Sequence, residues 1–302
     1  MRRQIIAITG PTASGKSRLA IELAKEINGE IISADSRLIY KDFDIAVAKP
    51  SVEDLESVRH HLVNIIDPSY QYTVGNFLDE ARNCIEDIRS RGKIPIVTGG
   101  TGLYFRSLLQ DYDIPRVEPD IELRNSLEKL SSDELYKLLI QKDEKTALKI
   151  HKNNKVKIIR ALEIMDSLNM KLSQIEKTKK DEENVLWIGL KAEDRQKLYE
   201  RINKRVDIMF EKGIVLETKR LLEKYGKLSI MEATIGYDEV IKYLEGNISL
   251  EESIEKIKQN SRRYAKRQLS WMRGNNKIKW FDFDKMPFDK ILEATLFLYR
   301  NN

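Results

Sequence analysis

Short apolar runs alternate with helical patterns over the first third of the chain. Four of these runs read as β-strands: residues 4–9, 30–34, 62–66 and 94–98. Between them, apolar residues recur at helical spacing over residues 16–27 and 74–91, and Gly92 follows the second pattern as a helix C-terminal glycine should. Strands that alternate with helices are typical of a parallel sheet covered on both faces. The pattern therefore predicts an α/β fold.

The pattern changes after Pro115 and Pro119, where the strand signal stops and the chain becomes charged and helical. Apolar residues recur there at the spacing of a small helical bundle: Leu123, Leu127, Leu130, Leu135, Leu138, Leu139, Ile158, Ile159, Leu162 and Ile164. A polar stretch at 177–184 closes this segment. We therefore predict a core of residues 1–115 and 185–302 that carries an inserted helical lobe at residues 116–184.

The last part of the chain returns to the core. Residues 185–190 and 278–281 read as further strands, and residues 195–212, 215–225 and 250–272 read as helices.

The first predicted strand leads into a glycine-rich run, Gly10-Pro11-Thr12-Ala13-Ser14-Gly15-Lys16-Ser17, and a helix follows. This spacing satisfies the phosphate-binding pattern of P-loop proteins. Backbone N–H groups at the helix start attract phosphate oxygens, Lys16 adds a positive charge, and Ser17 can ligate magnesium. The run (the phosphate loop) predicts a P-loop NTPase-like sheet, but it does not say which phosphate is bound or what reaction follows.

Two more polar segments follow predicted strands. Asp35-Ser36 ends the second strand, at the edge that borders the ligand crevice in an open parallel sheet. Asp35 can act there as a general base or a metal ligand, or it can cap a turn. The run Gly99-Gly100-Thr101-Gly102 (the glycine loop) follows the strand at 94–98. Its glycines indicate close approach of a ligand or a tight turn, and a turn alone does not require Thr101.

The composition argues against several classes of protein. No apolar run is long enough to span a bilayer and no signal segment precedes the first strand, so we expect a cytoplasmic protein that does not enter membranes. The single cysteine, Cys84, lies in a helical pattern and is expected to be an inert thiol, and three histidines are too few for a structural zinc site.

Positive charge is unevenly distributed along the chain. Residues 256–279 hold nine Lys or Arg and no acidic residue, and residues 149–180 hold nine against three acidic residues. Either run can be a solvated helix face, and the two together are equally consistent with a polyanionic partner.

The order of motifs resembles that of the bacterial tRNA dimethylallyltransferase (tRNA isopentenyltransferase) family over nearly the whole chain. The segments that carry the resemblance are the phosphate loop, Ala34-Asp35-Ser36, Ala48-Lys49-Pro50, His60-His61-Leu62, Gly99-Gly100-Thr101-Gly102-Leu103-Tyr104, Ile159-Arg160-Ala161-Leu162-Glu163, Ile235-Gly236-Tyr237 and residues 264–271. The resemblance implies a prenyltransferase that moves a dimethylallyl group from dimethylallyl diphosphate to N6 of the tRNA adenosine 3′ of the anticodon (position 37) and releases diphosphate.

The resemblance also implies roles for individual residues. Asp35 is the base that takes the amine proton, Thr101 lies near the reacting groups, and Lys16, the phosphate loop, Mg²⁺ at Ser17 and Arg267 meet the charge of the leaving diphosphate, with Arg262 a weaker candidate. The residues expected to contact the tRNA anticodon stem-loop are Asp35, Ser36, Arg37, Leu38, Thr101, Arg124, Ile159, Arg160, Ala161, Leu162 and Glu163. A surface salt bridge is the alternative role for Arg124 and Arg160.

The sequence departs from the family pattern at three positions beside the expected site. Leu38 replaces a usual glutamine, and Ala46 and Val47 replace glycine and threonine. These changes leave open a diverged protein that binds tRNA and catalyses poorly. A transferase for free adenine nucleotides and a small-molecule P-loop kinase are further alternatives, although an inserted lobe and basic runs suit a larger acceptor. We expect a monomer.

Overall fold

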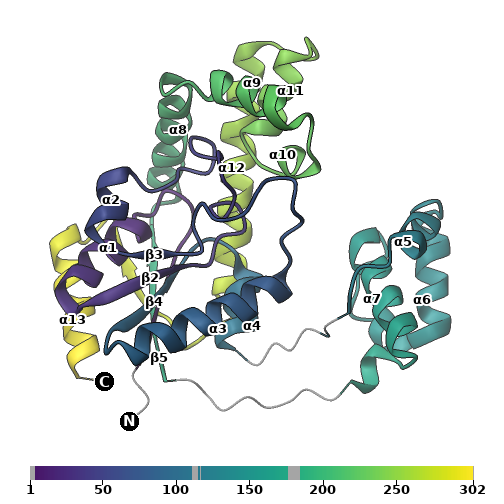
Figure 1. Cartoon of the computed structure of the whole chain (residues 1–302), viewed down its shortest axis with the longest axis horizontal. Helices are drawn as coiled ribbons and strands as arrows, with labels where there is room; N and C mark the ends of the chain where they lie inside the picture. The colour runs from purple at the N-terminus through teal and green to yellow at the C-terminus, as the bar shows by residue number, and fades with distance from the viewer. Residues whose placement is uncertain (1–3, 111–114, 116, 176–183, 302) are drawn as a thin grey trace. The chain divides into compact units, whose positions relative to one another are not determined.

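The computed structural model describes residues 4–110, 115, 117–175 and 184–301. The chain divides into two compact units, which we call the core unit (Met1–Gln110 with Glu182–Asn302) and the helical unit (Asp111–Asp181). Figure 1 labels their helices and strands. The stretch predicted to close the inserted lobe, residues 177–184, lies almost wholly outside the described residues.

The core unit is built on a six-stranded parallel sheet in the order β3-β2-β4-β1-β5-β6. The strands are β1 (Ile5–Thr9), β2 (Gly29–Ser33), β3 (His60–His61), β4 (Ile94–Thr98), β5 (Val185–Lys191) and β6 (Lys279–Asp282). The central strand β1 pairs with β4 on one side and β5 on the other. The α/β parallel sheet predicted from the sequence is confirmed.

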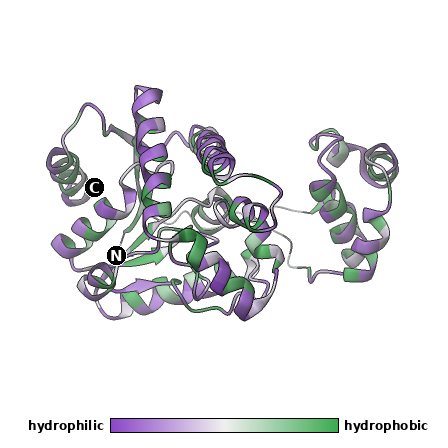
Figure 2. Ribbon diagram, turned by 90° about the horizontal axis from the view of Figure 1, so that it is seen from above, coloured by the Kyte–Doolittle hydropathy of each residue, from purple (hydrophilic) through white to green (hydrophobic). Residues whose placement is uncertain are grey.

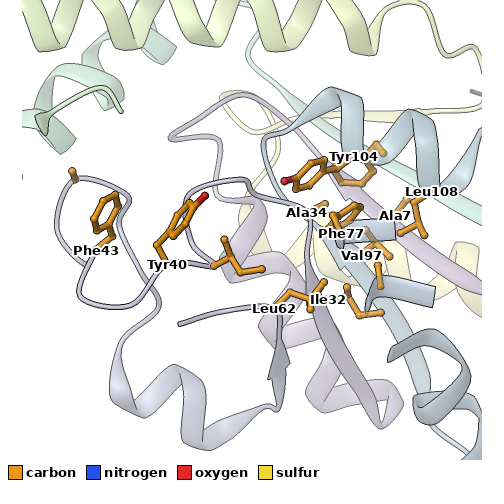
Figure 3. Close-up of a cluster of buried hydrophobic side chains, with 14 of the residues drawn as sticks. Ala7, Ile32, Ala34, Tyr40, Phe43, Leu62, Phe77, Val97, Tyr104 and Leu108 are labelled. Atoms are coloured by element: carbon orange, nitrogen blue, oxygen red, sulfur yellow. The ribbon is translucent and has the colours of Figure 1, made fainter. Parts of the chain in front are cut away.

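Helices cover both faces of the sheet, as the alternating strand pattern requires. On one face, α1 (Lys16–Ile27) and α13 (Phe288–Arg300) pack on Ile6 and Ile8 of β1. On the other face, α3 (Val74–Ser90) and α4 (Gly102–Leu109) pack on Ala7 and its neighbours. Figure 3 shows part of this second layer, and Figure 2 shows hydrophobic strands and helices in which hydrophobic and hydrophilic residues alternate.

Six more helices complete the core unit. They are α2 (Val52–Ser57), α8 (Arg195–Glu211), α9 (Ile214–Tyr225), α10 (Ser229–Glu232), α11 (Tyr237–Leu244) and α12 (Leu250–Met272). The long helix α12 begins where Ser249 and Glu252 form a capping box. Ala265 of α12 packs on Leu198 and Ile202 of α8, which brings the two helices together beside the sheet.

One predicted strand is wrong. Residues 62–66 were expected to form a strand because they are apolar, whereas β3 consists of His60–His61 alone. Leu62 and Asn64 have positive φ angles of 61° and 58°, which are incompatible with extended backbone, so the chain turns away from the sheet. Only an isolated bridge from Ile66 to Tyr40 remains beyond this point.

The helical unit has its own core. It contains α5 (Ile121–Glu128), α6 (Ser132–Ala147), α7 (Lys155–Leu168) and the short 3-10 helix η1 (Leu172–Gln174). The buried side chains come from the leucines and isoleucines that the sequence placed at bundle spacing, including Leu127, Leu135, Leu139, Ile158 and Leu162. In the described parts of both units, no helix is long and apolar enough to cross a membrane.

Candidate active site

The phosphate loop leads from β1 into the first turn of α1. Gly15, the residue before the helix, has a φ of 92°, a conformation that favours glycine, and no side chain caps the helix start. The N–H groups of the first turn are therefore available to an anion, and no acidic side chain occupies that turn to compete for them. Lys16 is half-buried and Ser17 is exposed at this helix end.

A cavity of about 290 Å³ opens beside the phosphate loop in the core unit. It is lined by three residues of the loop, Thr12, Lys16 and Ser17. A second cavity of about 420 Å³ shares Lys16 and Ser17 with the first and is also lined by Ala13 and Gly15. Gly10, Pro11 and Ser14 of the predicted set line neither cavity, and Ser14 is buried.

The segment after β2 forms another part of the cavity lining. Asp35, Ser36, Arg37 and Leu38 all line the 290 Å³ cavity, so four residues predicted from the sequence meet there. One Asp35 oxygen, Oδ1, accepts a hydrogen bond from the Arg37 N–H at 2.9 Å. Asp35 thus serves the turn that the sequence left as an alternative, and its carboxylate still faces the cavity.

The glycine loop is bonded to this segment, and its first residue, Gly99, also lines the cavity. The Thr101 Oγ1 accepts a hydrogen bond from the Ser36 N–H at 3.0 Å, and the Thr101 N–H donates to the Ala34 carbonyl at 3.1 Å. Thr101 is not among the residues that line the cavity, and it acts on the cavity wall through Ser36. The glycine loop therefore sets the position of the segment that carries Asp35.

Arg205 is a cavity residue that sequence reasoning missed. It projects from α8 on the same face as Ile202 and Val206, lines both cavities, and donates from Nη2 to the Val47 carbonyl at 3.4 Å. Burial lowers the pKa of Arg205, and nearby Asp35 raises it. An arginine beside the apolar stripe of an amphipathic helix is a signal that could have identified it.

Lys16 and Arg205 are two of the positively charged residues that line the cavity. Burial lowers the pKa of Lys16 to about 8, the neighbouring Arg205 acts in the same direction, and Asp35 opposes both. Two cations held close together without a bound anion repel each other, so their arrangement favours a polyanionic ligand. Arg267 of α12 also lines the cavity.

Arg262 does not join this group. Its Nη1 donates to Asn203 Oδ1 at 2.6 Å, and it does not line the cavity. The weaker expectation that Arg262 adds charge to the leaving group is therefore not supported by its position.

The three departures from the family pattern lie at the cavity. Leu38 and Val47 line it, and Ala46 lines it and is buried. Ala46 is absent from the residues with positive φ, so its backbone does not require glycine. The effect of these positions on rate and selectivity remains a prediction.

The expected RNA-contact residues of the helical unit lie around a buried carboxylate. Glu163 is 0% exposed and accepts hydrogen bonds from Arg124 Nε at 2.7 Å, Arg124 Nη2 at 2.8 Å and the Asp120 N–H at 2.8 Å. Arg160 also pairs with Glu163, and its Nη2 donates to the Val117 carbonyl at 2.9 Å. The salt bridges that were the alternative role for Arg124 and Arg160 are thus present.

The other members of this set are core residues. Ile159, Ala161 and Leu162 are buried with Glu163, so their side chains hold α7 in place and offer no surface to RNA. Among the residues of the helical unit that were expected to contact RNA, Arg124 and Arg160 therefore remain as candidates.

Cys84 and His61 have structural surroundings, whereas His60 also lines the 290 Å³ cavity. Burial raises the pKa of Cys84 to about 11, which agrees with an inert thiol. His60 is bonded to the Val58 carbonyl and His61 to Glu30. Among the described residues, no group of three or more His, Cys, Asp or Glu is arranged to hold a metal ion.

The fold and the site together define an α/β protein of the P-loop-like type, in which one cationic cavity is lined by the phosphate loop after β1 and by a carboxylate after β2. Comparison with known proteins identifies the family. The family model described as IPP transferase matches residues 38–275, and the one described as Isopentenyl transferase matches residues 3–67. The chain belongs to the IPP transferase family, whose bacterial members are its relatives.

Full-length relatives support this membership. The chain is 46% identical to the tRNA dimethylallyltransferase of Carboxydothermus hydrogenoformans, over 98% of this chain and 97% of that protein. It is also similar to the crystal structure of the tRNA isopentenylpyrophosphate transferase from Bacillus halodurans, with a TM-score of 0.74, 40% identity and coverage of 98% and 95%. A eukaryotic dimethylallyltransferase solved acting on tRNA matches with a TM-score of 0.84, 31% identity and coverage of 99% and 80%.

Proposed function

We propose that this chain transfers a dimethylallyl group from dimethylallyl diphosphate to N6 of the adenosine 3′ of the anticodon in tRNA, and releases diphosphate. The observation that carries the proposal is that one cavity is lined both by groups that can bind a diphosphate and by a carboxylate that can accept a proton. Thr12, Lys16 and Ser17 of the phosphate loop, Arg205 and Asp35 all line this cavity. Relatives named tRNA dimethylallyltransferase over nearly the full chain support tRNA as the acceptor and dimethylallyl as the group transferred.

Asp35 is the proposed general base. An exocyclic adenine amine is a weak nucleophile because its lone pair is delocalised into the ring, so its proton must leave as the new bond forms. The nitrogen bonds to the first carbon of the dimethylallyl group, the carbon–oxygen bond to diphosphate breaks, and the proton passes to the Asp35 carboxylate. Thr101 and Ser36 hold this carboxylate in place through the hydrogen bond between them.

The leaving group takes the bonding electrons and gains negative charge. Lys16, Arg205 and Arg267 line the cavity and provide fixed positive charge, and the N–H groups at the start of α1 provide oriented dipoles. Charges that are already in position stabilise the departing diphosphate without reorganisation, and stabilisation of this kind supplies much of the rate enhancement of many enzymes.

Mg²⁺ fits this site as a companion of the diphosphate. Ser17 offers one hydroxyl oxygen at the exposed start of α1, and the described residues hold no carboxylate cluster for a permanently bound ion. Mg²⁺ is commonly held by one or two protein oxygens together with substrate phosphates and water. When bound, it neutralises part of the diphosphate charge. Ser17 and Lys16 would hold the metal–diphosphate pair at the helix start.

The tRNA anticodon stem-loop is the proposed acceptor. A base in a stacked loop must be turned outward to enter a cavity of this size. Asp35, Ser36, Arg37, Leu38 and Thr101 are the proposed contacts in the core unit, and Arg124 and Arg160 are those in the helical unit. We propose that residues 116–184 form the tRNA-binding lobe and that the chain acts as a cytoplasmic monomer.

The test is mass analysis of nucleosides from unmodified tRNA incubated with the protein, dimethylallyl diphosphate and Mg²⁺. The expected product is adenosine heavier by one dimethylallyl group at the position next to the anticodon. Prenylation of AMP in preference to tRNA would contradict the acceptor, and a phosphorylated product from ATP would contradict the reaction class. Tight binding of tRNA without product would make the protein a binding paralogue.

A further inference from the structure

Gln268 of α12 links two loops that lie far apart in sequence. Its Oε1 accepts a hydrogen bond from the Thr12 N–H of the phosphate loop at 2.8 Å. Its Nε2 donates to the Gly100 carbonyl of the glycine loop at 2.9 Å. The side chain is 2% exposed, so its single amide group is committed to these two backbone atoms.

The fit around this amide is close. A methyl group built on Gly100 would lie 2.4 Å from Gln268 Nε2 and 3.3 Å from Asp35 Oδ2, so only glycine leaves room for the amide beside the carboxylate. The Tyr264 hydroxyl donates to the same Gly100 carbonyl at 3.2 Å from one helical turn earlier. Two α12 side chains therefore hold the glycine loop, and Gln268 alone also holds the phosphate loop.

The connection that Gln268 makes between the two loops, which we call the Gln268 bridge, continues to the segment that carries the proposed base. From Gly100, the glycine loop passes to Thr101, whose Oγ1 accepts from the Ser36 N–H beside Asp35. One connected path thus runs from the Thr12 backbone through Gln268, Gly100 and Thr101 to the segment that carries Asp35. An amide is suited to this task because it offers one acceptor and one donor in a fixed plane.

We propose that Gln268 is a positioning residue that sets the distance between the diphosphate held by the phosphate loop and the Asp35 base. This inference rests on the proposed function. Transfer requires the reacting carbon and the amine to meet within a narrow range of distances, and a displacement of about 1 Å can cost ~100-fold in rate. Gln268 also lines the cavity, and it acts through the register of the two loops because its amide atoms are bonded to their backbones.

The test compares Gln268→Met with wild type. Methionine keeps the length and unbranched shape of glutamine and removes both hydrogen bonds. We expect the single-turnover transfer rate at saturating substrates to fall by roughly 100-fold, with pyrophosphate affinity within about threefold of wild type, because an interaction that aligns the reactants affects the chemical step more than binding.

Amide hydrogen exchange tests the Gln268 bridge independently of the transfer reaction. In wild type, pyrophosphate with Mg²⁺ is expected to slow exchange in both the phosphate loop and the glycine loop. In Gln268→Met the slowing is expected in the phosphate loop only. If wild type forms no prenylated adenosine but shows this linked protection, the proposed function fails and the bridge stands. If both loops are still protected together in Gln268→Met, the bridge is overturned.

Two further variants separate positioning from folding. Asn260→Leu removes another α12 amide, which donates to Glu239 Oε1 at 2.7 Å and reaches neither loop. If Asn260→Leu lowers the melting temperature as much as Gln268→Met and slows transfer equally, Gln268 is merely structural. Gln268→Glu retains an acceptor for the Thr12 N–H but no donor for the Gly100 carbonyl. It is expected to slow transfer as Gln268→Met does, and wild-type transfer by Gln268→Glu would contradict the two-ended bridge.

Discussion

The Thr101 hydroxyl accepts a hydrogen bond from the backbone N–H of Ser36 at 3.0 Å, across 65 positions of sequence. The contact joins the loop after β4 to the loop after β2 at the edge of the sheet where their strands end side by side. It fixes the backbone directly after Asp35. The proposed base is therefore held by a residue that is itself outside the cavity lining.

Removal of the Thr101 hydroxyl should slow transfer and leave the fold intact. Thr101→Val keeps the shape of the side chain and leaves the half-buried Ser36 N–H without its acceptor, a loss of about 1–2 kcal/mol. We expect a fall of roughly 10- to 100-fold in single-turnover rate. Thr101→Ser retains the hydroxyl and should recover most of the rate. Equal rates for Thr101→Val and wild type would remove Thr101 from the site.

Asp35→Asn tests the role of Asp35 as a general base separately from its hydrogen bond in the turn. Asparagine still offers an oxygen to the Arg37 N–H, which donates to Asp35 Oδ1 at 2.9 Å in wild type, so the local backbone should persist. The amide cannot take a proton from adenine N6, and the loss of a general base typically costs roughly 10²- to 10⁴-fold in rate. Rapid-quench measurement of prenylated RNA checks the rate. Pyrophosphate titration is the control, and weakened pyrophosphate binding without slower transfer would contradict the assignment.

Diphosphate binding should weaken as the pH rises. Burial lowers the pKa of Lys16 to about 8, so its ammonium is charged below pH 8 and is lost above it. The attraction to an anion is therefore full below that value and declines above it. We expect the affinity of wild type for pyrophosphate to fall by roughly fivefold from about pH 8 to about pH 9, relative to Lys16→Arg, whose guanidinium stays charged. The ratio of the two proteins cancels the titration of pyrophosphate itself. A ratio that is constant with pH would show that Lys16 stays charged throughout.

The buried Glu30 should stabilise the core unit at neutral pH. Its side chain is 1% exposed and accepts hydrogen bonds from Arg91 Nη2, Lys93 Nζ and His61 Nε2, each at 2.7 Å. The hydrogen bond from Arg91 is the main cause that holds the pKa of Glu30 far below its ordinary value. Glu30→Gln leaves the three partners without their carboxylate and should cost about 3 kcal/mol of unfolding free energy at neutral pH.

The pH dependence of this effect has a defined sign. A carboxylate with a depressed folded-state pKa contributes stability above its unfolded-state pKa and loses it as the pH falls below that value. Urea unfolding of wild type and Glu30→Gln should therefore differ most at neutral pH and converge below the ordinary glutamate pKa of 4.5. A gap that widens on acidification would contradict the account.

Local patterns were sufficient for the elements with strong periodicity. Helix α1 begins and ends where its apolar stripe predicted, and α12 begins at Leu250 beside its capping box. The strand expected at residues 62–66 failed because hydrophobicity does not report the left-handed φ angles of Leu62 and Asn64. Apolar composition indicates that a segment is covered, and it does not show whether the backbone is extended.

The site was predictable where its residues stand next to strand ends. Asp35 and the phosphate loop could be placed at one sheet edge because parallel strands end together. Gln268 could not, because it comes from a helix whose rotation about its own axis depends on tertiary packing, and the only signal for Arg205 was its position beside the apolar stripe of a helix. The pairing of Arg124 and Arg160 with Glu163 could not be predicted either, since the sequence of a basic run does not show that a glutamate within it will be buried.

Arg160 provides the sharpest test of RNA binding by the helical unit. It shares the buried Glu163 with Arg124, and its side chain remains 32% exposed. If it also contacts a phosphate of the stem-loop, Arg160→Gln should weaken RNA binding and reduce the slope of log affinity against log salt by about one. Lys142→Gln is a matched control, because Lys142 pairs with Asp166 at 3.3 Å on the surface of the same unit. Its slope should equal that of wild type.

Stability separates the two roles that Arg160 can have. Removal of one partner of a buried carboxylate destabilises the unit, so Arg160→Gln is expected to lower the unfolding free energy as well. Binding must therefore be measured well below the melting temperature of the variant, with its helical content confirmed by circular dichroism. A loss of stability with an unchanged salt slope would mean that Arg160 serves only Glu163. The positive charge that meets RNA would then have to come from the exposed lysines of the helical unit, such as Lys149 and Lys152.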